Sequence, residues 1–244
     1  MDDVKLIDKS VDDIRNRKYL YIMYKVMKEI GRKIGPVIVR MDNQHQLNID
    51  INEWNYVIHL SYLLGKMEGG AKKKVLLDTD YINGEIYKQV RSTNNSNARE
   101  AQEKFDQFKK EKDTKMSNKA SKDYINVRPD FVIHQSHDVD YDYRGQKLII
   151  EAKTTKDLDE IDFCWDFLKL NFYVDEFKFR NALYMLVNID RKQIINMFDI
   201  YREKIDYYCN DMSKIWLFVQ NWDGEKMSPV NIYQIEREPA KNKR

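Results

Sequence analysis

Two carboxylates and a lysine stand close together near the middle of the chain. Asp130 follows Pro129, and Lys153 lies two residues after Glu151, all within residues 127–155. Carboxylate oxygens are ligands that Mg²⁺ prefers, and Mg²⁺ in proteins usually keeps several of its waters. A bound divalent ion lowers the pKa of a coordinated water and neutralises charge that develops on a phosphate. A lysine beside the ion can orient or deprotonate that water, or stabilise the transition state through its charge. These residues therefore indicate metal-assisted hydrolysis of a phosphodiester.

Neighbouring strands are needed to bring the two acids together. Residues 146–154 form an apolar segment that predicts a strand, and successive side chains of a strand point to opposite faces. Glu151 and Lys153 are thus expected on one face, with Leu148, Ile150 and Ala152 directed into a core on the other. Residues 126–134 predict the preceding strand. The polar connection between the two strands lets them lie side by side, which would bring Asp130 against Glu151.

The same residues also fit a solvated ion pair on a strand, because both Pro-Asp and Glu-x-Lys are common patterns. The surrounding sequence favours the site, since two apolar strands, a polar connection and a following helix occur in order. Pro129-Asp130 and Glu151-Ala152-Lys153 together resemble the PD-(D/E)xK nuclease superfamily. The resemblance extends over about residues 52–189.

The resemblance implies a restriction-endonuclease-like fold, in which the core runs helix, three strands, helix, strand and the acids lie on the second and third strands. It implies that Asp130 and Glu151 bind Mg²⁺, or Mn²⁺ in its place, with help from the carbonyl of Ala152. It assigns Lys153 to the attacking water. Members of the superfamily often add a glutamate from the first core helix.

Glu53 is the best match for that additional catalytic acid, because its predicted helix precedes the first core strand. A glutamate that merely favours the positive end of the helix dipole is the alternative for Glu53, and Glu85 and Glu103 are weaker rivals for the role. Lys169, on the helix after Lys153, is expected to contact the scissile phosphate. Its alternative is a surface pair with Asp166, three residues earlier.

The elements before the acids are an N-terminal extension and the start of the core. Residues 11–33 predict one amphipathic helix, and 37–41 with 46–51 a strand pair. Residues 52–66 predict the first core helix, in which Trp54, Val57, Ile58 and Leu64 would pack onto the sheet. Residues 75–81 predict a strand. The polar stretch 91–123 predicts a mobile insertion with an exposed helix near 98–112.

The elements after the acids alternate between helices and strands. Residues 158–172 and 191–211 predict helices, whereas 181–189 and 214–220 predict strands. The nearly continuous apolar run at 181–189 is typical of a strand covered on both faces. This alternation predicts an α/β fold with a mixed central sheet flanked by helices. We divide the chain into an extension, residues 1–51, and a nuclease-like domain, residues 52–244, with the insertion 91–123.

Composition limits the function classes. The 244 residues are 42% hydrophobic, which suffices for a packed core and excludes a disordered chain. No apolar run approaches the roughly 20 residues of a membrane span. The acidic N-terminus does not resemble a secretory signal, and two cysteines make no disulfide framework or zinc site. We therefore expect a cytoplasmic protein without a membrane partner.

The expected substrate is DNA, in restriction, repair or phage defence, although the net charge of +2 requires any basic surface to be local. Two alternatives stay open. One is an RNA-cleaving effector, and the other is a catalytically inactive nuclease fold that binds nucleic acid or acts as a scaffold. A homodimer is a further open expectation, because nucleases that cut both strands often act as two-fold dimers.

Overall fold

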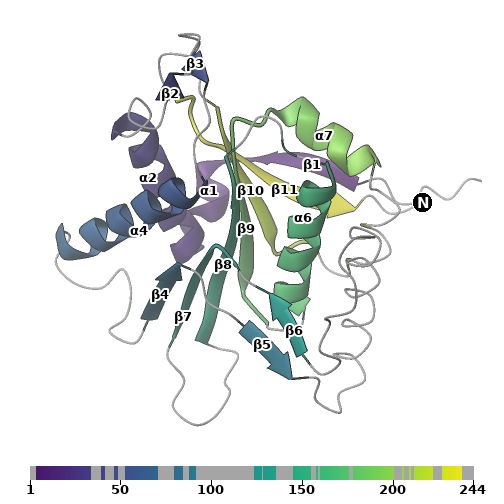
Figure 1. Cartoon of the computed structure of the whole chain (residues 1–244), viewed down its shortest axis with the longest axis horizontal. Helices are drawn as coiled ribbons and strands as arrows, with labels where there is room; N and C mark the ends of the chain where they lie inside the picture. Colours follow the sequence, from purple (N-terminus) through teal and green to yellow (C-terminus); the bar gives the residue numbers. More distant parts are fainter. Residues whose placement is uncertain are drawn as a thin grey trace, which may run out of the picture.

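The structure is a computed structural model, and its central feature is one sheet between two layers of helices (Figure 1). It describes residues 4–33, 40–41, 47–48, 53–70, 80–84, 88–91, 124–127, 129–135, 145–154, 158, 160–175, 178–200, 205, 209, 212–221 and 227–237.

Seven strands form this sheet, in the order β1-β11-β10-β9-β8-β7-β4. Their bounds are β1 Val4–Lys9, β4 Asp80–Gly84, β7 Phe131–Gln135, β8 Gln146–Lys153, β9 Asn181–Val187, β10 Ile215–Gln220 and β11 Asn231–Arg237. The three central strands β8, β9 and β10 run parallel to one another, whereas every other neighbouring pair is antiparallel. The predicted α/β fold with a mixed sheet flanked by helices is therefore confirmed.

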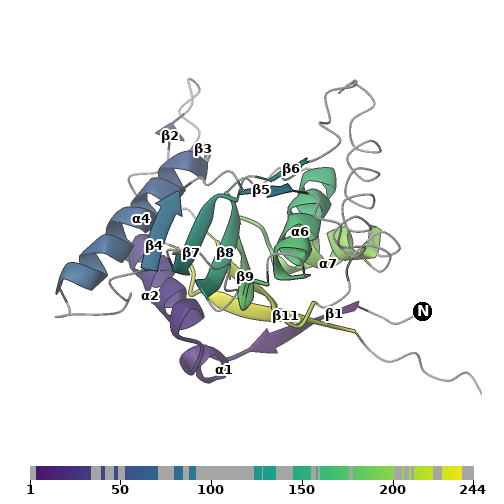
Figure 2. The same cartoon turned by 90° about the horizontal axis from the view of Figure 1, so that it is seen from below.

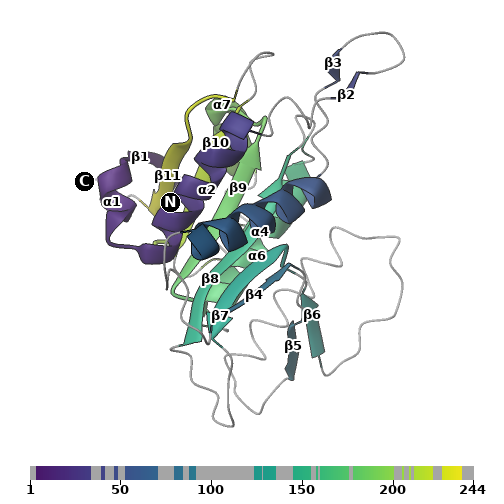
Figure 3. The ribbon, with the colours of Figure 1, turned by 90° about the vertical axis from the view of Figure 1, so that its left-hand side faces the viewer.

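Helices cover both faces of the sheet, as Figure 2 shows from below. On one face lie α1 Val11–Arg15, α2 Lys18–Lys33 and α4 Glu53–Gly70, and on the other lie α6 Glu160–Asp175 and α7 Arg191–Ile200. Figure 3 shows α2 and α4 lying across the sheet. Each face buries its own apolar cluster, which explains why the central strands are apolar on both sides.

Alternate residues of β8 pack against the two different layers of helices. Ile149 of β8 packs into the cluster under α6 and α7, whereas Leu148 and Ile150 pack into the cluster under α2 and α4. This alternation follows from the pleat of the strand. The predicted alternation of residues 146–154 is therefore correct, but both faces are buried.

The N-terminal part differs from the prediction. Residues 11–33 are two helices, α1 and α2, because the first ends at Arg15 and its cap residue is Asn16. Before them, β1 pairs with β11 at the edge of the central sheet, with Ile7 opposite Gln234. The residues that we assigned to an extension thus contribute a strand to that sheet. The predicted strand pair is present as β2 Arg40–Met41 and β3 Leu47–Asn48.

Two further predictions need correction. The strand expected at 126–134 is divided into β6 Tyr124–Val127, which pairs with β5 Lys88–Arg91, and β7, which joins the central sheet. Pro129 lies between β6 and β7, where its missing N–H prevents a continuous ladder. The helix expected at 52–66 is α4, but Ile58 does not pack onto the sheet as predicted, because it is 46% exposed. The buried face of α4 consists of Tyr56, Val57, Leu60, Leu63 and Leu64.

Some predictions lie outside the described residues. These are residues 75–79 of the strand expected at 75–81, the exposed helix at 98–112 and most of the insertion 91–123. Residues 80 and 81 of the expected strand belong to β4. In the part of the chain that is described, no helix has the length and apolar character needed to span a bilayer.

Candidate active site

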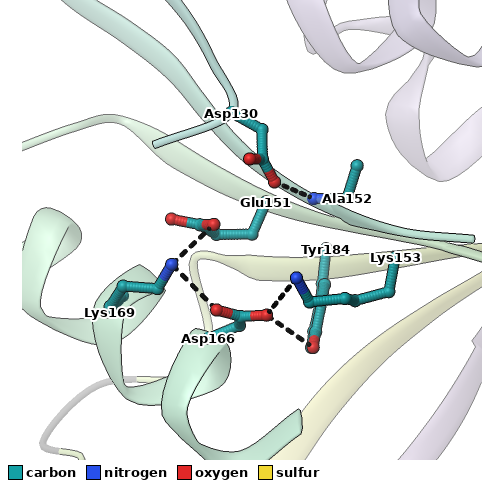
Figure 4. Close-up of polar contacts among 7 residues, drawn as sticks. All are labelled: Asp130, Glu151, Ala152, Lys153, Asp166, Lys169 and Tyr184. Carbon is teal, nitrogen blue, oxygen red and sulfur yellow. Dashed lines mark hydrogen bonds and ion pairs between the residues drawn. The ribbon is translucent and has the colours of Figure 1, made fainter. Parts of the chain in front are cut away.

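The site lies at the C-terminal end of β8, on the face of the sheet covered by α6 (Figure 4). Glu151 and Lys153 share the face of Ile149, which packs against α6. The register of β8 with β9 sets Glu151 opposite Tyr184. Strand alternation and strand pairing therefore fix the direction of these side chains.

Asp130 is the residue immediately before β7. Phe131 pairs with Ile150, so the end of β7 brings Asp130 alongside the last residues of β8. Its Oδ2 accepts a hydrogen bond from the backbone N–H of Ala152 at 2.7 Å. The N–H and C=O of one residue on an extended strand point to the same side, so the carbonyl of Ala152 is directed to the same side of β8 as its N–H. The structure thus brings together Asp130, Glu151 and Ala152.

Glu151 is the most deeply buried acid of the site, with 1% of its surface exposed. Its Oε2 accepts from Lys169 Nζ at 2.8 Å, and its buried Oε1 has no hydrogen-bond donor among the described residues. Burial raises the pKa of Glu151, and the nearby Asp130 and Asp166 raise it further against the opposing charge of Lys169. A buried carboxylate oxygen without a donor is costly, so Oε1 suits a ligand that supplies positive charge.

Burial also raises the pKa of Asp130, against the hydrogen bond from Ala152 and the charges of Lys169 and Lys153. The charge of Asp166 raises the pKa of both acids, and the charge of Asp130 raises that of Glu151 as well, because like charges lie close together in a buried region. A cation near both acids would relieve that repulsion.

Helix α6 supplies two charged side chains one turn apart. Asp166 Oδ1 lies 2.8 Å from Lys169 Nζ, and Asp166 Oδ2 lies 3.1 Å from Lys153 Nζ. Burial alone would lower the pKa of Lys169, but Glu151 and Asp166 raise it well above its ordinary value. The alternative of an Asp166–Lys169 pair is present in the structure, but the pair is buried and not at the surface, and Lys169 also reaches across to Glu151.

Aromatic packing fixes α6 against the sheet. Phe163 stacks on Tyr184 with ring centroids 5.3 Å apart, and meets Phe198 of α7 edge to face at 5.2 Å. Phe167 meets the same Phe198 at 5.1 Å. Such contacts bury large apolar areas and hold preferred ring geometries. Asp166 and Lys169 therefore project from a helix whose position is set by its core.

Two tyrosines join the site without any signal in the local sequence. The Tyr184 hydroxyl donates to Asp166 Oδ2 at 3.5 Å. Burial raises the pKa of Tyr173 well above its ordinary value, and the charges of Glu151, Asp130 and Asp166 raise it further. The relevant signal for Tyr184 is its register opposite Glu151, which becomes visible once β8 and β9 are known to be parallel neighbours.

The oxygen atoms of the site that could bind a divalent ion come from two carboxylates and one backbone carbonyl. Within the described ranges, no group of three or more His, Cys, Asp or Glu side chains forms a metal site, and Asp166 is directed to the two lysines. Asp130, Glu151 and the Ala152 carbonyl remain as hard oxygen donors, which fits Mg²⁺, because that ion commonly binds one or two carboxylates plus waters or substrate phosphate. The site contains three carboxyl groups and two ammonium groups, so a bound cation would bring its total charge closer to neutral.

Glu53 is the first residue of α4, which packs on the face of the sheet opposite α6. Its side chain lies outside the described residues, as do Glu85 and Glu103. The choice among these glutamates therefore stays a prediction.

Comparison of the chain with protein-family models, with curated proteins and with solved structures finds no match in any of the three.

Proposed function

We propose that this chain is a divalent-metal-dependent nuclease of the restriction-endonuclease-like kind, acting on the phosphodiester bonds of DNA. The observation that carries the proposal is the pairing of Asp130 with the Ala152 N–H beside buried Glu151, whose Oε1 has no donor among the residues described. Hard oxygen donors and Lys153 thus converge at the end of one strand.

The order of elements supports the same proposal. The elements α4, β4, β7, β8, α6 and β9 give helix, three strands, helix and strand, with β5 and β6 inserted between β4 and β7. Asp130 precedes the second of these strands in the central sheet, and Glu151 lies on the third. This is the order that the resemblance to the PD-(D/E)xK superfamily implies.

In the proposed reaction, Asp130, Glu151 and the Ala152 carbonyl would hold Mg²⁺ or Mn²⁺. When bound, the ion supplies activation of water and neutralisation of charge on the phosphate. Lys153 lies two residues beyond Glu151 on the same face and would act on the attacking water or on the developing charge. Lys169, one turn beyond Asp166, would meet the scissile phosphate after exchanging its contact with Glu151 for the substrate.

The ion pairs of the site favour a second candidate. Lys153 pairs with Asp166, and Lys169 pairs with both Glu151 and Asp166, so both ammonium groups already have carboxylate partners within the protein. A nuclease fold that binds nucleic acid without cutting it would keep such ion pairs. Binding to DNA or RNA that is unaffected by EDTA, with no cleavage, would distinguish this candidate.

Cleavage assays with matched variants test the proposal. Purified protein is incubated with supercoiled, linear and single-stranded DNA, and with RNA, in Mg²⁺, Mn²⁺ or EDTA. Cleavage is expected with a divalent ion and not with EDTA. Lys153→Ala should abolish cleavage while binding is retained, because the lysine acts in the transition state, and Asp130→Asn should also lose metal affinity. Lys178→Ala, an exposed lysine outside the site, is the control. Equal rates in the parent, Lys153→Ala and Asp130→Asn would refute the assignment.

A further inference from the structure

Asp166 makes a contact that the resemblance does not assign. Its two carboxylate oxygens each bind a different lysine, Oδ1 to Lys169 at 2.8 Å and Oδ2 to Lys153 at 3.1 Å. Figure 4 shows Asp166 between the two amines, with Lys169 continuing to Glu151. The carboxylate therefore joins the lysine of β8 to the lysine of α6.

Lysine side chains need such a partner to hold one position. Each carries a flexible four-carbon stem with considerable rotamer entropy, so an unrestrained amine samples many positions. Two ammonium groups in one buried region also repel each other. A carboxylate between them offsets the repulsion and restricts both stems.

The position of Asp166 is itself well defined. It lies on α6 between Phe163 and Phe167, whose rings pack on Phe198. The Tyr184 hydroxyl of β9 reaches its Oδ2 at 3.5 Å. Asp166 is buried, so its location is set by packing rather than by solvent.

We propose that Asp166 is a positioning residue that holds Lys153 and Lys169 at separate, fixed places beside Glu151. This inference rests on the proposed nuclease function for its kinetic consequence, but the placement of the lysines can be measured without activity. Asp166 as a third metal ligand is the competing role, and it is disfavoured because both oxygens are engaged by lysines.

Asp166→Asn and Asp166→Glu separate these roles. Asparagine keeps the shape but has one acceptor oxygen, so it can hold one amine and presents an N–H₂ group to the other. Glutamate keeps both oxygens on a longer stem. We expect kcat to fall about 100-fold in Asp166→Asn, the scale of a misplaced reacting group. KM should change much less, and Asp166→Glu should restore part of kcat. Asp199→Asn, at an exposed position of α7, is the matched control.

Amine labelling gives the readout that does not depend on cleavage. Parent and variants are treated with a succinimidyl ester in EDTA, and labelling of Lys153 and Lys169 is measured by peptide mass spectrometry relative to exposed Lys178. Lys153 should be labelled several-fold faster in Asp166→Asn than in the parent, and again slowly in Asp166→Glu. Because Asp166→Glu keeps the charge, it also tests the inference if Asp166→Asn fails to fold.

The outcomes are distinguishable. If the parent cleaves and Asp166→Asn cleaves equally fast, the positioning role is wrong and the nuclease function stands. If the parent does not cleave, the proposed function fails, and labelling alone decides the placement of the lysines. Unchanged labelling in Asp166→Asn overturns the inference in every case. Weakened Mn²⁺ binding by calorimetry with unchanged labelling would make Asp166 a metal ligand instead.

Discussion

Replacing Lys169 by methionine should destabilise the protein strongly in the absence of divalent ions. The ammonium lies 2.8 Å from both Glu151 Oε2 and Asp166 Oδ1, and those carboxylate side chains are 1% and 4% exposed. Removing one partner of a buried ion pair leaves an uncompensated charge and typically costs about 3–5 kcal/mol. Methionine keeps the length of the stem, so the loss of charge dominates over the loss of packing.

The matched control is Lys9→Met. Lys9 pairs with Glu236 at 2.9 Å, a similar distance, but the two side chains are 21% and 51% exposed. A surface pair of this kind contributes about 0–1 kcal/mol. Urea unfolding followed by circular dichroism in EDTA should therefore separate the variants by about 2–5 kcal/mol. At this chain length each kcal/mol corresponds to about 2–4 °C in Tm.

Stability measurements at lower pH and with added Mg²⁺ connect this result to the site. Because burial raises the pKa of Glu151, protonation of that group offsets part of the loss, so the destabilisation should shrink as the pH is lowered. Under the proposed function Mg²⁺ binds the folded state at this site, so added Mg²⁺ should restore about 2.7 kcal/mol to Lys169→Met at 100 times its Kd. A loss in Lys169→Met no larger than that in Lys9→Met would refute the reasoning.

Four other changes test the surrounding fold and its electrostatics. The pKa of Glu151 is raised above 4.5, so its stabilising contribution is present below that pH and is lost as the pH rises through the folded-state value. Glu151→Gln should therefore gain stability relative to the parent as the pH of a denaturation series rises above about 4.5. Asp13→Asn should show the opposite trend, losing its deficit as the pH falls, because the Ser10 hydrogen bonds lower the pKa of Asp13; parallel curves would contradict both. Ile150→Ala should cost about 2–5 kcal/mol of unfolding free energy, as a fully buried side chain on β8. Arg17→Ala should cost about 0.5–1 kcal/mol, because its guanidinium lies 5.0 Å from the Trp216 ring centroid; a change above 2 kcal/mol would indicate another role for Arg17.

The central strands could be predicted from local sequence, whereas the edge strands could not. β8, β9 and β10 are buried on nearly every residue, so their apolar runs are distinctive. β1 and β11 mix charged and apolar residues, and their sequences VKLIDK and NIYQIER fit a strand or a loop equally well. Their pairing with each other decides the structure, and that information is not local.

The residues of the site also divide into those that local sequence reveals and those that depend on how distant segments pack. The spacing of Asp130, Glu151 and Lys153 was visible because strand alternation acts over a few residues. The i, i+3 spacing of Asp166 and Lys169 was also visible, but their burial depends on how α6 docks on the sheet. Tyr184 could not be found, because a parallel register between β8 and β9 joins segments separated by an entire helix.

The order of strands in the sheet constrains the order in which the protein can fold during synthesis. In the described sheet, β1 has β11 as its one neighbour, and β11 lies between β1 and β10. The first strand to be made therefore has no place to pair until the last strand of the sheet arrives. Until then β10 presents an unpaired edge, the kind of surface on which strands from other chains add. Because the β1–β11 contact spans nearly the whole described chain, its closure adds a large entropic cost and slows the final folding step.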